Sequence, residues 1–191
     1  MTALSDNPLL SFTDLPPFSK IQPEQIKPAV EQAIRDARAV VEQVVASSEV
    51  SWQAIVEQLE QGSDRLNKLW SPVSHLNSVA NSPELRAAYE SCLPLLSDFS
   101  TWLGQHEGLY QKYQALAQSA DFSSLTAAQQ KVVTNALRDF KLSGIGLADD
   151  KKLRYGEIQS RSSDLASTFS NHCLDATQAW FKQVTDVAEL T

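Results

Sequence analysis

The stretch PEQIKPAVEQAIRDARAVVEQVV, residues 23–45, decides the fold class of this chain. Its apolar residues recur at steps of three and four, which places them along one face of an α-helix. They are Ile26, Val30, Ala33, Ile34, Ala37, Val41, Val44 and Val45. Pro23 suits the first helical position, where its missing backbone N–H costs no hydrogen bond. The pattern therefore predicts a long amphipathic helix that begins at Pro23.

Two further segments share this periodicity and contain prolines that should disturb a helix. In the first, about residues 51–76, Pro72 should kink or divide the helix, because proline lacks the backbone N–H and its ring clashes with the preceding turn. The second begins with Ser82-Pro83, a capping residue followed by proline at the first position. Its apolar stripe continues to Tyr113, so we expect one long helix there, bent near Pro94.

Two more helices complete the pattern. Thr126 and Gln129 form a capping box at the start of the fourth helix, which should end at Ser143-Gly144. The fifth should run from about residue 149 to 180. Its apolar stripe consists of Ile158, Leu165, Phe169, Cys173 and Ala176. We interpret Cys173 as a core residue on this stripe.

The chain is predicted to be all-α, a bundle of about five long, partly kinked helices over residues 23–191. Residues 1–22 should form an extended arm packed on these helices, because its apolar side chains are too numerous for a free tail. They are Leu9, Leu10, Phe12, Leu15, Phe18 and Ile21. The last residues, WFKQVTDVAELT (180–191), are typical of the start of a strand or of a new unit. A lone strand has no partner, so we expect the natural polypeptide to continue.

Composition and charge exclude several classes of protein. The net charge is −7, and no basic cluster exceeds Lys151-Lys152, so a nucleic-acid partner is not expected. The first residues lack the features of a secretory signal, and no apolar run is long enough to span a membrane. We expect a cytoplasmic protein whose two cysteines, Cys92 and Cys173, are reduced.

The sequence His106-Glu107-Gly-Leu-Tyr110 comes close to the zinc-protease motif H-E-x-x-H. That motif works because two histidines one helical turn apart bind the same metal ion. Tyr110 stands in place of the second histidine, and a neutral phenol is a poor zinc ligand. His106 also falls on the apolar stripe of its predicted helix. We therefore interpret it as a packed, hydrogen-bonded histidine and expect no metal site here.

Other candidate groups do not assemble into a site. His75 could pair with Ser71 or Ser74, but no nucleophile elbow accompanies it, so local hydrogen bonding is the favoured interpretation. His172 and Cys173 are adjacent and would point about 100° apart on a helix, which prevents them from sharing a metal ion easily. The acidic residues Asp149, Asp150, Glu157, Asp164 and Asp175 are spread over different faces, with the first two in the first turn of a helix. No catalytic or metal-binding residue is predicted, and substrate-binding residues stay undetermined.

Five runs of sequence resemble the N-terminal part of the thimet-oligopeptidase-like family of zinc metallopeptidases. They are LPPFSKIQPEQIKPAV (15–30), SPVSHLNSVANSPELRAAYE (71–90), LPLLSDFSTWLGQHEGLY (93–110), NALRDFKLSGIGL (135–147) and FSNHCLDAT (169–177). The resemblance extends in order from Pro8 to Leu190, which makes it more specific than any single motif.

The resemblance implies a longer, largely helical peptidase of two lobes flanking a deep channel. Its zinc ligands and catalytic glutamate would lie in a C-terminal catalytic domain outside this chain, which would act on short peptides. The 191 residues would then be a helical N-terminal domain that forms one wall of the channel and limits substrate size, and that is inactive alone.

Two alternatives remain open from the residues themselves. One is a free-standing helical domain that binds partner proteins through its amphipathic helices, because periodicity cannot distinguish such a surface from an ordinary core. The other is a self-contained metalloenzyme that uses His106, which would require the unfavourable ligand Tyr110.

Overall fold

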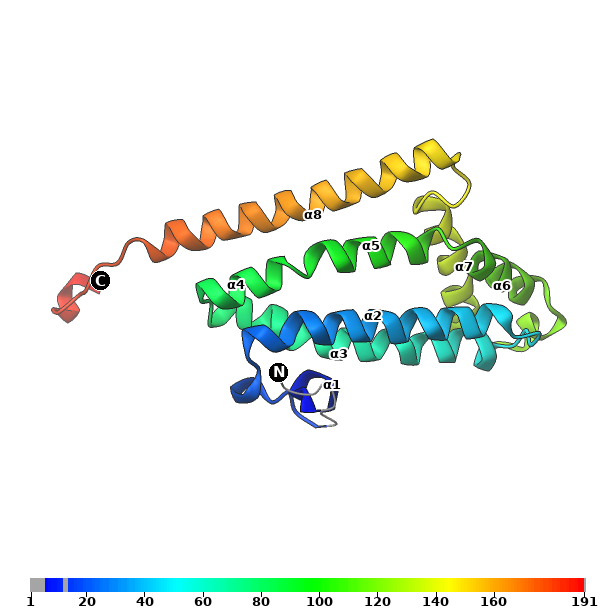
Figure 1. Cartoon of the computed structure of the whole chain (residues 1–191), viewed down its shortest axis with the longest axis horizontal. Helices are drawn as coiled ribbons and strands as arrows, with labels where there is room; N and C mark the ends of the chain where they lie inside the picture. The colour runs from blue at the N-terminus through cyan, green and yellow to red at the C-terminus, as the bar shows by residue number, and fades with distance from the viewer. Residues whose placement is uncertain (1–5, 12–13, 191) are drawn as a thin grey trace.

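The structure is a computed structural model that describes residues 6–11 and 14–190, and every regular element within these residues is helical (Figure 1). The all-α prediction is confirmed. The α-helices are α1 (Pro8–Ser11), α2 (Pro23–Ala46), α3 (Gln58–Val79), α4 (Pro83–Glu90), α5 (Leu93–Gly104), α6 (Glu107–Gln118), α7 (Ala127–Leu142) and α8 (Asp149–Gln178). Of the described helices, none is both long enough and apolar enough to cross a membrane.

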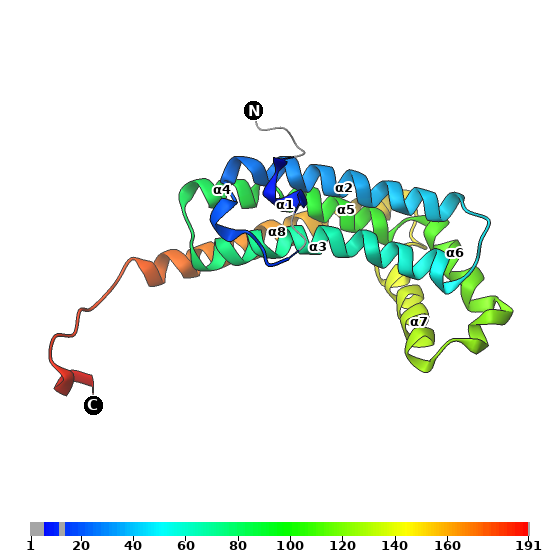
Figure 2. The same ribbon diagram turned by 90° about the horizontal axis from the view of Figure 1, so that it is seen from below.

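The long helices form layers that run along the length of the molecule. Helices α2 and α3 lie antiparallel, α4 and α5 lie beside them, and α8 packs on α5 at the outer side (Figure 1). Helices α6 and α7 close one end, and α7 projects away from the long helices there (Figure 2). The arm with α1 lies against α2, on the side away from α8.

Two clusters of buried side chains hold these layers together, and α2 contributes to both. The first includes the N-terminal half of α2, with Ile26 and Val30 fully buried against residues of α3, α4 and α5. The second includes Val41 and Val44 from its C-terminal half, packed on α6 and α7. Helix α2 therefore connects the long layers to the closed end.

The segment 23–45 forms the helix that its periodicity predicts. Pro23 is the first residue of α2, and the backbone N–H of Gln22 donates a hydrogen bond to Oε1 of Gln25 at 2.9 Å. In α3, Pro72 does not divide the helix, which continues to Val79. Pro72 is buried there, and packing of its neighbours outweighs the single backbone hydrogen bond that proline cannot make.

The single long helix expected over residues 83–113 is wrong, because the structure breaks it twice. Ser82 caps α4 as predicted, its hydroxyl accepting a hydrogen bond from the Leu85 N–H at 3.2 Å. Helix α4 ends at Glu90, and α5 restarts with Pro94 in its first turn, where the missing N–H is harmless. The second break falls at His106, which starts α6.

The described part of the arm contains helical turns at Pro8–Ser11 and Phe18–Lys20 and so is not extended throughout. Asn7 ties it to α2, because its buried side-chain amide donates to the Gln25 carbonyl at 2.8 Å. Leu9 and Ile21 are buried, whereas the side chains of Leu15 and Phe18 are exposed rather than buried as expected. Phe12 lies outside the described residues.

The C-terminal end of α7 follows the sequence prediction. After the cap residue Ser143, the Gly144 N–H bonds the Lys141 carbonyl, and the Ile145 N–H bonds the Phe140 carbonyl. This is the Schellman arrangement, which needs a residue with positive φ, and Gly144 has φ of 86°. Ile145 and Phe140 then meet in the second core cluster.

We predict that Gly144→Ala lowers the free energy of unfolding by about 1–2 kcal/mol, the cost of the left-handed conformation for an L-residue. A Cβ at this position would also lie 2.7 Å from Cδ1 of Leu147, which would have to move. Gly146→Ala is the matched control, because a Cβ there meets no atom within 4 Å and its φ is not positive. Urea denaturation followed by circular dichroism measures both variants, and equal stabilities would contradict the assignment of this cap.

Residues 180–186 are irregular and Val187–Leu190 form a short 3-10 helix. Of the two alternatives for these residues, the start of a strand is wrong for the described part of the chain, and the start of a new unit stays a prediction. The segment has no neighbouring strand there with which to pair, so its β-branched and aromatic residues do not form a sheet.

Candidate functional site

His106 lies in the break between α5 and α6, not inside a helix as its stripe position suggested. Its Nδ1 accepts a hydrogen bond from the Leu109 N–H at 3.2 Å and thereby caps α6. Its Nε2 lies 3.3 Å from Oε1 of Glu42, and its ring and that of Trp102 form a T-shaped pair at 4.9 Å between centroids. A neutral imidazole in this arrangement carries its proton on Nε2 and donates it towards Glu42.

Glu107 and Tyr110, which follow His106 in this stretch, contact different helices. Glu107 is exposed and forms an ion pair with Lys152 of α8 at 3.2 Å. The ring of Tyr110 packs edge-on against Phe140 of α7, at 5.6 Å between centroids. The three groups of the HEGLY stretch therefore do not converge on one point. Within residues 6–11 and 14–190, no group of three or more His, Cys, Asp or Glu side chains is arranged to hold a metal ion.

His75 lies on the exposed side of α3, within a regular helix. Its ring contacts that of Phe18 from the arm, at 5.6 Å between centroids. Ser74 uses its carbonyl to accept a hydrogen bond from the Ser78 hydroxyl, and the structure forms no hydrogen bond between His75 and either Ser71 or Ser74. The structure therefore does not assemble a nucleophile and base here.

The two cysteines are both free and lie in opposite environments. Cys92 is buried, its thiol bonds the Ala88 carbonyl at 3.3 Å, and burial raises the pKa of that thiol. Cys173 is exposed, so its assignment to the core is wrong. His172 beside it is exposed as well.

The acidic residues form separate interactions. Asp149 and Asp150 lie in the first turn of α8, where carboxylates are favourable to the helix dipole. Glu157 pairs with Arg154 on the same helix. Asp175 accepts two hydrogen bonds from Arg86 of α4, at 2.7 and 3.0 Å, and this guanidinium holds the pKa of the Asp175 carboxyl below its ordinary value. Of these interactions, the Arg86–Asp175 pair joins α8 to α4, and the acidic residues do not converge on one site.

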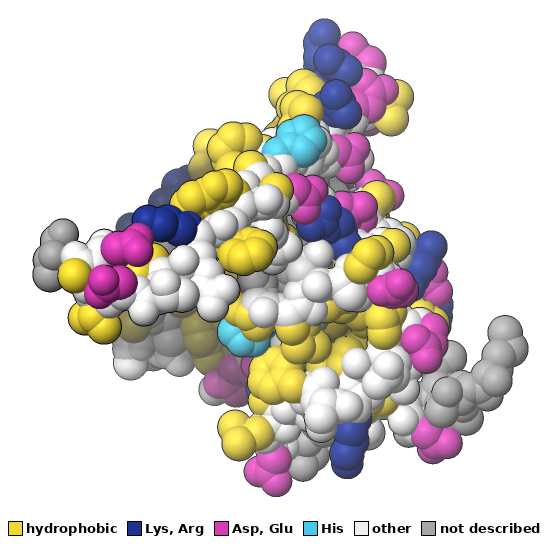
Figure 3. Space-filling model, turned by 90° about the vertical axis from the view of Figure 1, so that its left-hand side faces the viewer, with side chains coloured by type: hydrophobic (Ala, Val, Ile, Leu, Met, Phe, Trp, Pro, Cys, Tyr) yellow, Lys and Arg dark blue, Asp and Glu magenta, His cyan; other side chains and the backbone are white. Residues whose placement is uncertain are grey.

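The apolar stripe of α8 is exposed, although its periodicity suggested a buried face. Ile158, Leu165 and Phe169 are 51%, 52% and 70% exposed. The helix packs on α5 through another side, where Gly156 faces Thr101, and none of its residues is buried. We call Ile158, Leu165 and Phe169 the outer face of α8. Further apolar side chains reach the surface at the end of the molecule towards which the chain's C-terminus runs (Figure 3), where Trp180 and Phe181 are exposed.

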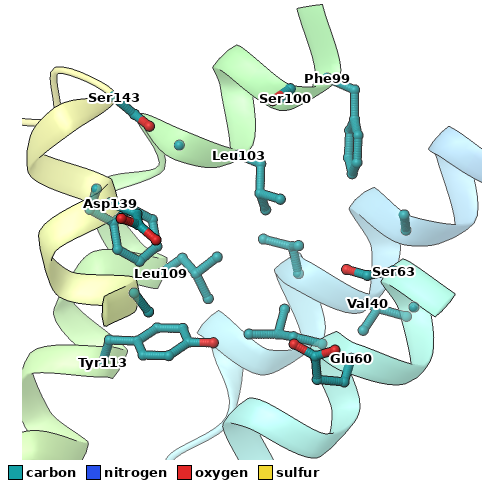
Figure 4. A pocket seen from close by; sticks show the side chains of 17 residues that line it. Val40, Glu60, Ser63, Phe99, Ser100, Leu103, Leu109, Tyr113, Asp139 and Ser143 are labelled. Atoms are coloured by element: carbon teal, nitrogen blue, oxygen red, sulfur yellow. The ribbon is translucent and has the colours of Figure 1, made fainter. Parts of the chain in front are cut away.

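A cavity of about 300 Å³ lies between five helices (Figure 4). Val40 of α2, Leu103 of α5 and Leu109 of α6 supply apolar wall, and Gly62 of α3 lies beside Val40. Helix α7 closes the side opposite α3. We call this space the interhelical cavity.

Polar groups reach the interhelical cavity from opposite sides. The Tyr113 side chain is only 8% exposed, yet its hydroxyl points into the cavity towards Glu60 (Figure 4). Burial, together with the charge of Glu60, raises the pKa of Tyr113 to about 12, so the phenol stays neutral. Asp139 lies on the α7 side and pairs with Arg138 at 2.8 Å.

Sequence reasoning did not single out this cavity. Tyr113 belongs to the apolar stripe of its predicted helix, and Glu60 carries no local signal that separates it from other surface carboxylates. Only the packing of α3 and of α6 against α2 brings the two side chains to one space.

Comparison with known proteins shows what the chain is similar to. Residues 29–152 match the family model described as Neurolysin/Thimet oligopeptidase, N-terminal domain. The chain is 56% identical over 184 residues to "Oligopeptidase A" of Haemophilus influenzae and 56% identical over 185 residues to "Oligopeptidase A" of Escherichia coli. It is 37% identical over 187 residues to "Probable cytosolic oligopeptidase A" of Arabidopsis thaliana. These alignments cover 96%, 96% and 98% of this chain but only 27% of each relative's length.

Proposed function

This chain belongs to the neurolysin/thimet oligopeptidase family, as its N-terminal domain, and from that premise we propose that it forms one wall of the substrate channel of a longer zinc oligopeptidase. The remaining polypeptide would carry the zinc ion and the catalytic groups. The substrates would be short peptides, and the helical wall would help to exclude larger ones.

The outer face of α8 is the observation that carries this proposal. A monomeric domain rarely leaves a row of large apolar side chains in water, and such a row marks a surface that another element covers. Because the chain spans 27% of the length of its relatives, the remaining polypeptide is the occupant that we assign to this face. The catalytic part would then pack against α8, on the side of the molecule opposite the arm.

The residues that the structure describes do not fit a zinc ion. Zinc sites in proteins use three or four His, Cys, Asp or Glu ligands, and the described residues bring no such group together. Both nitrogens of His106 are engaged, one with the Leu109 N–H and the other with Glu42. We therefore assign the zinc ligands to the polypeptide outside this chain and derive no catalytic step from the residues described.

The reaction itself can be tested by comparing the full-length protein with the 191-residue chain. We expect the full-length protein to contain zinc and to cleave a short quenched-fluorescent peptide, with activity lost to a chelator and restored by zinc. The chain alone should show neither zinc nor turnover. Zinc-dependent cleavage by the chain alone would contradict the assignment of roles, and an inactive full-length protein would contradict the function.

The reading frame after Thr191 separates this proposal from a free-standing interaction domain. An H-E-x-x-H motif downstream is expected, and a stop codon would favour the interaction domain. We further propose a cytoplasmic location, which the name of the Arabidopsis relative gives for that protein, and cell fractionation would test it. The net charge of −7 supports a protein without a nucleic-acid partner.

A further inference from the structure

We propose that the interhelical cavity binds a small amphipathic cation, a compact apolar body that carries one protonated amine. This inference rests on the cavity alone and does not depend on the proposed peptidase function. Three features of the cavity carry it: its size and apolar wall, the unpaired hydroxyl of Tyr113, and the negative charge of Glu60.

The space and its wall suit a small apolar body. A volume of about 300 Å³ is far larger than a single water molecule needs and lies at the lower end of the range for small-molecule pockets. Val40, Leu103 and Leu109 present methyl groups to it. An aromatic or branched aliphatic group of six to eight carbon atoms, about the size of a phenylalanine side chain, would replace water along these surfaces at a gain in free energy.

The hydroxyl of Tyr113 indicates that the cavity has a polar end. More than nine-tenths of the side chain is buried, and the described residues offer its hydroxyl no hydrogen-bond partner. The hydroxyl oxygen itself is accessible within the cavity, because no described side-chain oxygen or nitrogen is both sealed from solvent and unpaired, so it is open to a hydrogen bond from a ligand. A protonated amine would donate to its oxygen.

The charge of Glu60 selects a cation. Glu60 is exposed, its carboxylate faces the same part of the cavity as Tyr113 (Figure 4), and it forms no ion pair with any described residue. Of the described side chains that line the cavity, none belongs to Lys or Arg. Asp139 adds a second carboxylate on the α7 side, already paired with Arg138. An amine between the Glu60 carboxylate and the Tyr113 hydroxyl would form charge-assisted hydrogen bonds, which are stronger than neutral ones.

The test is a titration of the isotope-labelled 191-residue chain with 2-phenylethylamine at pH 7, followed by amide chemical shifts. The amine is protonated at this pH, because alkyl amines have a pKa near 10. We expect saturable shifts in α3 and α6 around the cavity. 2-Phenylethanol has nearly the same shape without the charge and should bind about tenfold more weakly. Shifts confined to other surfaces, or equal affinities for the two ligands, would overturn the proposal.

Three variants separate the contributions. Glu60→Gln removes the charge and should weaken amine binding about tenfold with little effect on the alcohol. Glu57→Gln, one turn earlier and outside the cavity, makes the same chemical change and should leave the affinity unaltered. Tyr113→Phe removes only the hydroxyl and should weaken the amine several-fold. Unchanged amine binding in both Glu60→Gln and Tyr113→Phe, with spectra that remain those of the folded chain, would show that the cavity does not select a cation.

Discussion

Replacing Ile26 by alanine is expected to lower the free energy of unfolding of this chain by about 3 kcal/mol, the cost of removing a fully buried aliphatic side chain and leaving a cavity. Ile26 is 0% exposed and lies in the first core cluster, where α2 meets the arm, α3 and α4. The neighbouring helices of this cluster are held by their other contacts, so they can move only partly into the cavity that the smaller side chain leaves.

Ile158→Ala is the matched control, because it makes the same chemical change at a side chain that is 51% exposed on α8. We expect its effect to stay within about 0.5 kcal/mol, as for most surface substitutions. Urea denaturation monitored by circular dichroism gives both values. If the two variants lost equal stability, the assignment of Ile26 as buried on α2 and of Ile158 as exposed on α8 would be wrong.

The parts of the fold that sequence predicts well are those decided by local chemistry. Helix α2 starts at Pro23, Ser82 caps α4, and α7 begins at Thr126 and ends before Gly144. Each of these depends on the few residues that form the cap or the first turn. Their hydrogen bonds are made within the segment itself, so no knowledge of distant residues is needed.

The break at His106 shows where periodicity fails. The apolar residues before and after His106 keep the spacing of a single helix, so their periodicity does not reveal that the helix ends at this point. The break depends on a side chain. The Leu109 N–H lies in the first turn of α6, where no backbone carbonyl of the helix can accept it, and the His106 imidazole accepts it instead. Histidine is uncommon in this role, so the local signal that marks Ser82 and Thr126 is absent.

The outer face of α8 shows a second limit, since an apolar stripe predicts that something covers a helix but not which molecule does. The same pattern gives a buried face in α2 and an exposed face in α8. The interhelical cavity is harder still to predict from sequence. Its lining comes from five helices, and their tertiary arrangement must be known before Tyr113 and Glu60 can be placed at one cavity.

Changing both Leu165 and Phe169 to glutamate should have a small effect on the stability of the 191-residue chain and a large one on that of the full-length protein. In the chain, these side chains are 52% and 70% exposed, so the loss of apolar contacts is small and the stability should change by less than about 1 kcal/mol. In the full-length protein, the proposed covering would bury two unpaired carboxylates. That should destabilise it by about 3 kcal/mol or more and reduce the peptidase activity with it.

The double variant Ser170→Glu and Thr177→Glu provides the matched control, because both residues are exposed on α8 and lie about 100° round the helix from its outer face. It adds the same charge to the same helix. Thermal unfolding of both variants, with reducing agent present to keep the exposed Cys173 free, compares the chain with the full-length protein. The measurement that decides is the loss of stability caused by the outer-face variant, compared between the chain and the full-length protein. If that loss is no larger in the full-length protein, the remaining polypeptide does not pack on α8. The proposal that this domain forms a channel wall would then lose its structural basis.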